Sequence, residues 1–85
     1  MIKLRGRIDT SNAAEFEKEM MGLVSPDMVL DAAELEYISS AGLRVLLKAA
    51  QAVNRKGGSM AVVNASSDVK NIFEITGLAD ALGVE

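Results

Sequence analysis

Tyr37–Leu47 reads YISSAGLRVLL, and this junction between a strand pattern and a helix pattern is the clearest indication of the fold. Apolar residues typical of a strand run directly into two serines, and a small pair, Ala41-Gly42, leads into a long helical pattern. A serine just before a helix caps it by accepting a hydrogen bond from a backbone N–H two or three residues further on. We therefore predict a strand that ends at Ile38 and a helix whose N-cap is Ser39 or Ser40.

The segment after the serines has the strongest helical periodicity in the sequence. Its apolar residues share one face, and its polar residues recur at helical spacing on another: Arg44, Lys48, Gln51 and Arg55. Gly57-Gly58 ends the pattern, because glycines weaken a helix and supply left-handed geometry for its exit. The segment is thus predicted to bury one face against the rest of the protein.

Strand and helix patterns alternate along the remaining sequence. Strands are predicted at 1–6, 28–31 and 59–64, and further helices at 13–23 and 66–77. Asn12 followed by Glu15 fits a capping box for the first of these helices, and Ser66 fits the N-cap of the last. Ala33-Glu34 forms a polar break after the second strand. This alternation indicates a single α/β domain over residues 1–85, with a small mixed, mostly parallel sheet and helices packed on it.

The composition excludes most enzyme chemistry. None of the 85 residues is cysteine or histidine, which removes disulfides, zinc–thiolate sites and a Ser-His-Asp triad. Twelve acidic against nine basic residues give a net charge of −3, which argues against non-specific binding to nucleic acid. No apolar run approaches the roughly 20 residues of a membrane span, and the N-terminus lacks the apolar segment of a signal peptide. We expect a cytoplasmic protein without a cofactor.

Two weaker patterns have simpler explanations than chemistry. Ser67 and Lys70 match the bare Ser-x-x-Lys pattern of penicillin-recognising enzymes, but they lie where a capped helix is predicted to begin, and the helix start explains them better. Four carboxylates could chelate a cation or could simply be scattered over the surface: Asp9, Asp31, Glu34 and Glu36. We favour the second interpretation, and expect neither a catalytic site nor a metal site.

The Ser39-Ser40 turn admits two interpretations. A serine N-cap is structurally complete and needs no further role. The same position also suits a regulatory phosphate, which adds about −1.5 to −2 charges at pH 7 beside unpaired helix N–H groups and the positive end of the helix dipole. A partner docked over that helix end would then face a bulky anion in place of a hydroxyl. The domain would be a binding switch with no catalysis of its own.

Over nearly its whole length, the chain resembles the STAS domain of the bacterial anti-sigma factor antagonists. Gly6–Asp9 (GRID) is similar to the Gly-x-Leu-Asp of that family, and Val29–Asp31 with Leu35–Leu43 is similar to its central signature. Gly57-Gly58 and the segment Val69–Leu78 resemble the start of its third strand and its third helix. Each match alone is weak, whereas their order along the chain is specific.

In that family, the serine two residues before the Gly-Leu pair is phosphorylated by a partner anti-sigma factor that is also a serine kinase. The resemblance implies that Ser40 is this phosphorylation site, with Asp9 nearby; many family members have aspartate where this chain has Ser39. The unphosphorylated antagonist binds the anti-sigma factor and releases the sigma factor, phosphorylation breaks that complex, and a phosphatase restores it. The implied partner-binding surface comprises Asp9, Thr10, Ser11, Ser39, Ser40, Ala41, Gly42, Leu43 and Arg44, with Lys48 at its margin.

Two further expectations concern function class and assembly. STAS domains also serve as regulatory parts of anion transporters and lipid-export ATPases, which is the alternative function, whereas nucleotide binding by the domain has no phosphate loop to support it. The chain starts almost at the second strand of the family, so the first family strand is expected to be absent and one sheet edge to be open. We expect that edge to be covered by self-association as a homodimer or by the C-terminal tail, because an open edge is a liability.

Overall fold

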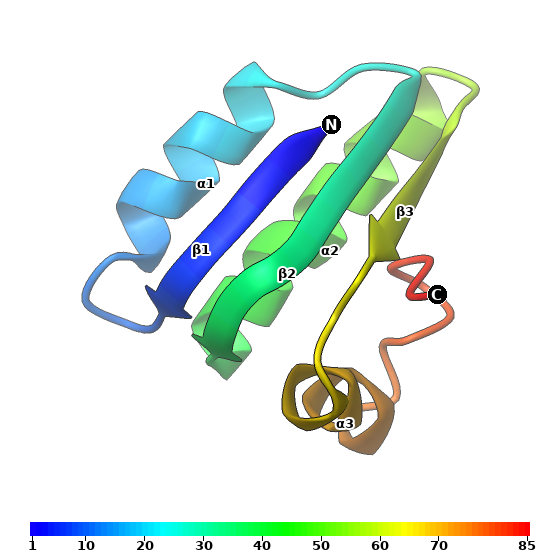
Figure 1. The fold of residues 1–85 in the computed structure, drawn as a ribbon. Coiled ribbons are helices and arrows are strands. Elements are labelled where there is room, and N and C mark those ends of the chain that lie inside the picture. The colour runs from blue at the N-terminus through cyan, green and yellow to red at the C-terminus, as the bar shows by residue number, and fades with distance from the viewer.

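The computed structural model describes residues 1–85, in which three strands alternate with three helices (Figure 1). The elements are β1 (Ile2–Ile8), α1 (Ala13–Gly22), β2 (Asp27–Ile38), α2 (Ser40–Arg55), β3 (Ser59–Val63) and α3 (Ser67–Ile75). The predicted order of elements is therefore confirmed, and so is the α/β class. None of the helices combines the length and the apolar character that crossing a membrane requires.

The three strands form one sheet in the order β1-β2-β3, and both pairings are parallel. The expected mixed, mostly parallel sheet is thus parallel in every pairing of its strands. Helix α2 lies behind the sheet in Figure 1, α1 lies beyond the outer edge of β1, and α3 lies below the end of β3. Because parallel strands joined by helices all point the same way, the carboxyl ends of β1 and β2 meet at one edge of the sheet.

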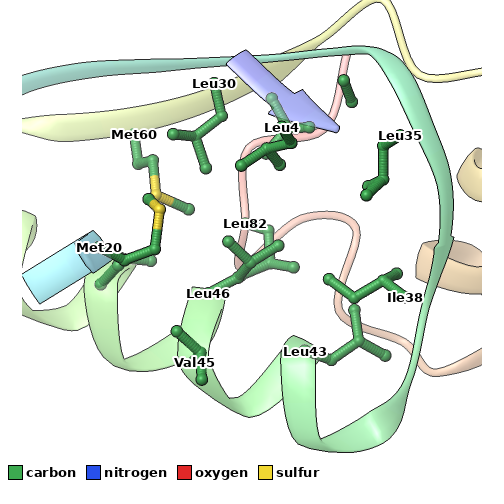
Figure 2. Packing of buried hydrophobic residues seen from close by; sticks show 14 of the residues in the cluster. Leu4, Met20, Leu30, Leu35, Ile38, Leu43, Val45, Leu46, Met60 and Leu82 are labelled. Carbon is green, nitrogen blue, oxygen red and sulfur yellow. The ribbon is translucent and has the colours of Figure 1, made fainter. Parts of the chain in front are cut away.

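The hydrophobic core fills the space between the sheet and the helices. Figure 2 shows Leu43 and Leu46 of α2 pointing toward the strands, and Val45 of the same helix belongs to the same buried cluster. The predicted apolar face of α2 is therefore confirmed. The C-terminal segment also contributes, because its Leu82 is completely buried in this cluster.

The polar break predicted in the middle of β2 is a bulge within one continuous strand. Between the pairs Lys3–Asp31 and Arg5–Glu34, β2 advances one residue further than β1. An extra residue of this kind leaves a backbone group without a partner in the ladder. Here the Asp31 carboxylate accepts a hydrogen bond from the Ala33 N–H at 3.0 Å. The two apolar runs on either side of the break therefore belong to a single strand.

The C-terminal segment lies along one edge of the sheet, at β3, and the other edge, at β1, has no neighbour of this kind. Val84 of the C-terminal segment forms a parallel bridge with Val62, on β3. The expectation that this tail covers the open edge of the sheet is wrong for the edge at β1, because the tail lies along β3. Strand β1 pairs with β2 on one side and has no strand on the other.

Candidate functional site

The site begins where β1 and β2 end side by side. Ile8 is paired with Ile38 in the ladder, and the Ser39 N–H donates a hydrogen bond of 2.8 Å to the Ile8 carbonyl. The chain then enters α2 without an intervening loop, since Ser40 is the first residue of the helix. The start of α2 is therefore fixed against the ends of both strands.

Ser39 is the N-cap of α2, which resolves the two alternatives left open by the sequence. Its side-chain Oγ accepts a hydrogen bond from the Gly42 N–H at 3.3 Å, and its carbonyl accepts one from the Leu43 N–H at 2.9 Å. Ser39 is half-buried, and its hydroxyl is already engaged in the capping hydrogen bond. The side chain of Ser40 takes no part in capping the helix.

Ser40 is exposed, and its hydroxyl makes no hydrogen bond within the protein. The backbone N–H groups of Ser40 and Ala41 have no acceptor, as expected for the first turn of a helix. Free N–H groups and the positive end of the dipole make a helix N-terminus favourable for an anion. A phosphate on Ser40 would thus be accommodated by backbone groups that are already available.

The loop after β1 carries the carboxylate of the site. The Asp9 carboxylate accepts hydrogen bonds from the Ser11 hydroxyl at 2.6 Å and from the Ser11 N–H at 2.9 Å. These two bonds lower the pKa of Asp9 below its ordinary value, the hydroxyl having the larger effect. Asp9 is therefore ionised at neutral pH, beside the start of α2.

Asn12 shapes this loop, a role that its sequence pattern did not indicate. Its side-chain Oδ1 accepts from the Asp9 N–H at 2.9 Å, and its Nδ2 donates to the Arg7 carbonyl at 2.8 Å. Asn12 is the N-cap residue of α1 by position, but its side chain makes no capping bond. The predicted capping box with Glu15 was therefore wrong. The signal that could have found the true role is an Asn just after a strand, where its amide can bond to local backbone.

Gly42 allows α2 to approach the strand ends closely. A Cβ atom at this position would lie 2.7 Å from Ile38 Cγ1 and 2.7 Å from Ile8 Cγ2. Gly42 and its neighbour Leu43 are both buried. Of the residues expected to form the partner-binding surface, these two therefore contribute packing beneath it and not exposed atoms.

The other expected site residues are accessible. The exposed ones are Thr10, Ser11, Ser40 and Arg44. Asp9 and Ala41 are half-buried, as Ser39 is. Arg44 makes no ion pair, whereas Lys48 at the margin lies 3.2 Å from Glu17 on α1. The structure thus brings the loop 9–11 and the first turn of α2 to the same edge of the molecule.

The weaker sequence patterns are accounted for by local structure. Ser66 caps α3 by accepting from the Val69 N–H at 3.3 Å, and Ser67 is the first residue of that helix, so the helix-start explanation of the Ser-x-x-Lys pattern is confirmed. The four carboxylates do not gather into a group of three possible metal ligands. One of them, Glu34, forms an exposed ion pair with Arg5 at 3.4 Å.

Sequence relatives of the chain carry a common name. BtrV of Bordetella bronchiseptica, whose name places it among the anti-sigma factor antagonists, is 36% identical over 77 residues, covering 87% of this chain and 66% of that protein. The anti-sigma-B factor antagonist of Bacillus subtilis is 27% identical over 85 residues, covering 98% of this chain and 78% of that protein. The chain therefore spans about two thirds to four fifths of the length of these relatives.

Solved structures show the same fold. An anti-sigma factor antagonist from Mycobacterium paratuberculosis superposes with a TM-score of 0.83 at 24% identity, covering 96% of this chain and 72% of that one. The anti-sigma factor antagonist SpoIIAA in its unphosphorylated form gives a TM-score of 0.80 at 17% identity, covering 98% and 74%. The sequence model of the STAS domain matches residues 1–85. The chain thus belongs to the STAS domain family.

Proposed function

We propose that this protein is an anti-sigma factor antagonist and that phosphorylation of Ser40 switches its binding. The unphosphorylated protein binds an anti-sigma factor that is also a serine kinase, and so frees the sigma factor. Phosphorylation of Ser40 by that kinase breaks the complex, and a phosphatase restores the binding form. The observation that carries this proposal is the exposed, unbonded hydroxyl of Ser40 at the first position of α2.

The relatives support this function. BtrV and the Bacillus subtilis protein are both named as antagonists of anti-sigma factors, and both align with most of this chain. The name of the SpoIIAA structure distinguishes an unphosphorylated form, which implies a phosphorylated one. The family-like Ser-Ala-Gly-Leu sequence of this chain begins at Ser40.

The hydrogen bonds favour Ser40 over Ser39 as the modified residue. A phosphate on Ser39 would have to replace a hydroxyl that caps α2 through the Gly42 N–H. A phosphate on Ser40 displaces no hydrogen bond and gains the free N–H groups of the first turn. The modification therefore adds charge to the surface while the helix start is preserved.

The surface around Ser40 explains how a phosphate would release a partner. Thr10, Ser11 and Arg44 are exposed, so a protein docked here contacts short polar side chains and one unpaired cation. A phosphate adds about −1.5 to −2 charges next to the ionised Asp9. It also occupies space that the docked partner fills. In this mechanism the chain supplies a hydroxyl and a binding surface, and the kinase supplies the catalysis.

Phosphate mapping tests the site. The wild-type protein is incubated with its anti-sigma factor kinase and Mg-ATP, and the phosphorylated residue is identified by mass spectrometry. We expect one phosphate on Ser40, none in Ser40→Ala, and normal modification of the matched control Ser39→Ala. Phosphate on Ser39, or continued modification of Ser40→Ala, would overturn the assignment.

Binding measurements test the switch itself. Ser40→Ala should bind the anti-sigma factor as the wild type does, because a small neutral side chain leaves the surface intact. Ser40→Asp should bind about tenfold or more weakly. Docking would remove water from the new carboxylate, and the anti-sigma factor would supply no opposite charge to pair with it, which costs at least about 1.4 kcal/mol. Equal affinity of the Asp and Ala variants would exclude a charge-based switch at this position.

A further inference from the structure

Arg7 and Tyr37 lie near the carboxyl ends of β1 and β2, just before the candidate site. They are partners in the ladder, and the Arg7 guanidinium lies over the Tyr37 ring, 4.6 Å from its centroid. Their neighbours Ile8 and Ile38 are buried in the core. Because successive side chains of a strand alternate, Arg7 and Tyr37 point to the opposite face of the sheet. In Figure 1 α2 lies behind the sheet, and no helix crosses in front of β1 and β2.

A bulge in β2 determines which residue Arg7 faces. Arg5 is paired with Glu34 in the ladder. A regular strand would therefore set Arg7 against Glu36. The register instead shifts by one residue just before Arg7, which leaves Glu36 out of the ladder and sets Tyr37 opposite Arg7. Bulges redirect side chains in this way and are frequent next to active sites. The shift thus gives Arg7 an aromatic partner in place of a carboxylate.

Arg5 and Arg7 are both exposed but differ in what they contact. Arg5 Nε lies 3.4 Å from Glu34 Oε2. Arg7 forms no ion pair, and none of its side-chain N–H groups donates a hydrogen bond within the protein. The Tyr37 ring meanwhile holds the planar guanidinium, so less freedom is lost when this group binds another molecule. Arg7 therefore presents free donors in a position that is already set.

The carboxylates beside Arg7 in the sequence and in the ladder leave it unpaired. The Asp9 carboxylate is engaged by the hydroxyl and the N–H of Ser11. These bonds are the main reason that the pKa of Asp9 is lowered, and the charge of Arg7 adds a smaller effect. Glu36 is exposed and forms no ion pair. Among protein groups, the planar anion that matches a guanidinium is the carboxylate of aspartate or glutamate.

We propose that Arg7 is a specificity-determining residue of the docking surface and binds an aspartate or glutamate carboxylate of the anti-sigma factor. This inference rests on the proposed function and adds the chemistry of one contact to it. Arg7 lies two residues before Asp9. Tyr37 lies two residues before Ser39, so a protein that covers the start of α2 also reaches the pair. A partner with a cation at this place would meet a like charge, so Arg7 selects among anti-sigma factors.

Phosphorylation kinetics test this contact, with the anti-sigma factor kinase that serves for mapping Ser40. Arg7→Ala should raise the KM for this protein about tenfold and leave kcat unchanged, because Arg7 binds the kinase away from the reacting hydroxyl. Arg7→Glu should raise KM about a hundredfold, since it sets two carboxylates against each other. Arg7→Lys should recover only part of the loss, because an ammonium lacks the planar fork. Arg55→Ala is the matched control, exposed in the last turn of α2, and should change neither constant.

Variants of Tyr37 test whether the ring holds Arg7 in position. Tyr37→Phe keeps the ring on which Arg7 stacks and should behave as the wild type. Tyr37→Leu keeps the charge of Arg7 but removes the surface that holds it, and should raise KM about threefold at unchanged kcat. Thermal unfolding by far-UV circular dichroism establishes first that each variant is folded at the assay temperature.

The outcomes separate this inference from the proposed function. If neither the wild type nor Arg55→Ala is phosphorylated, the proposed function is wrong and the role of Arg7 falls with it. If both are phosphorylated and Arg7→Ala or Arg7→Glu keeps the wild-type KM, the role of Arg7 alone is refuted. A lower kcat at unchanged KM would place Arg7 in the reaction and overturn its docking role. A wild-type KM for Arg7→Lys would overturn the bidentate contact with a carboxylate.

Discussion

Replacing Gly42 with alanine tests whether close contact between α2 and the strand ends holds the site in place. The new Cβ would lie 2.7 Å from Ile38 Cγ1 and 2.7 Å from Ile8 Cγ2. Non-bonded carbon atoms pack best at about 3.5–4.0 Å, so the helix or the isoleucines must move by about 1 Å. Both isoleucines are buried, and β-branched side chains have little rotamer freedom with which to yield.

The expected loss of stability follows from two opposing effects. Inserting a methyl group into a packed core costs about 1–3 kcal/mol. Alanine regains up to about 1 kcal/mol over glycine inside a helix, and less in the first turn. The net destabilisation of Gly42→Ala is therefore about 1–2 kcal/mol. For a domain of this size, each 1 kcal/mol lowers Tm by about 4–8 °C, which predicts a decrease of about 4–16 °C.

Thermal unfolding followed by far-UV circular dichroism measures this decrease, and urea titration gives the free energy of unfolding independently. Gly22→Ala is the matched control. Gly22 is the last residue of α1, and a Cβ there meets nothing within 4 Å. The control should unfold at the wild-type temperature or slightly above it. If Gly42→Ala were as stable as Gly22→Ala, the tight contact at the start of α2 would not be a constraint, and the reasoning would fail.

Three further predictions use the same measurements. Ser40→Asp should be as stable as the wild type or up to about 1 kcal/mol more stable, because its charge lies at the positive end of α2; a fall in Tm would indicate that the switch acts through unfolding. The pKa of Asp9 is lowered in the folded protein, so the stability it contributes is present above the unfolded pKa and is lost as pH falls through the lower folded value. Acid titration of Ser11→Ala should show less of this loss, and an unchanged acid profile would contradict the assigned cause. Gly58→Ala should fail to fold or unfold at a far lower temperature, since its Cβ would collide with the backbone carbonyl oxygen of Pro26; a cooperative transition near that of the wild type would contradict the close approach of the two backbones.

Helix caps and the order of elements could be predicted from the sequence, because each depends on a local pattern of residues. A serine placed directly before an apolar helical pattern predicted the cap at Ser66 and limited the cap of α2 to Ser39 or Ser40, of which Ser39 is the one present. The order of strands and helices followed from hydrophobic spacing. These features depend on residues close together in the chain, so no knowledge of tertiary contacts was needed.

The features that the sequence did not predict depend on contacts with other parts of the chain. Ala33 looked like part of a break because its polar surroundings suggest a turn, but β1 alongside holds it in a bulged strand, with its N–H bonded to Asp31. Asn12 has the right position for a cap, but its side chain bonds instead to the Asp9 N–H and the Arg7 carbonyl. Which sheet edge the C-terminal segment covers was equally inaccessible, because either edge satisfies the same apolar pattern.

In the proposed switch, the structural role belongs to Ser39 and the regulatory role to the adjacent Ser40. Ser39 caps the N-terminus of α2, and the close packing of Gly42 against Ile8 and Ile38 sets where the helix begins. The position of Ser40 is therefore set by contacts in which its own side chain takes no part. Its side chain can gain or lose a phosphate without the loss of a hydrogen bond or a change in packing. A partner that docks over the first turn of α2 then meets either a hydroxyl or an anion on the same fold, so the proposed switch operates at the surface and leaves the stability of the domain in place.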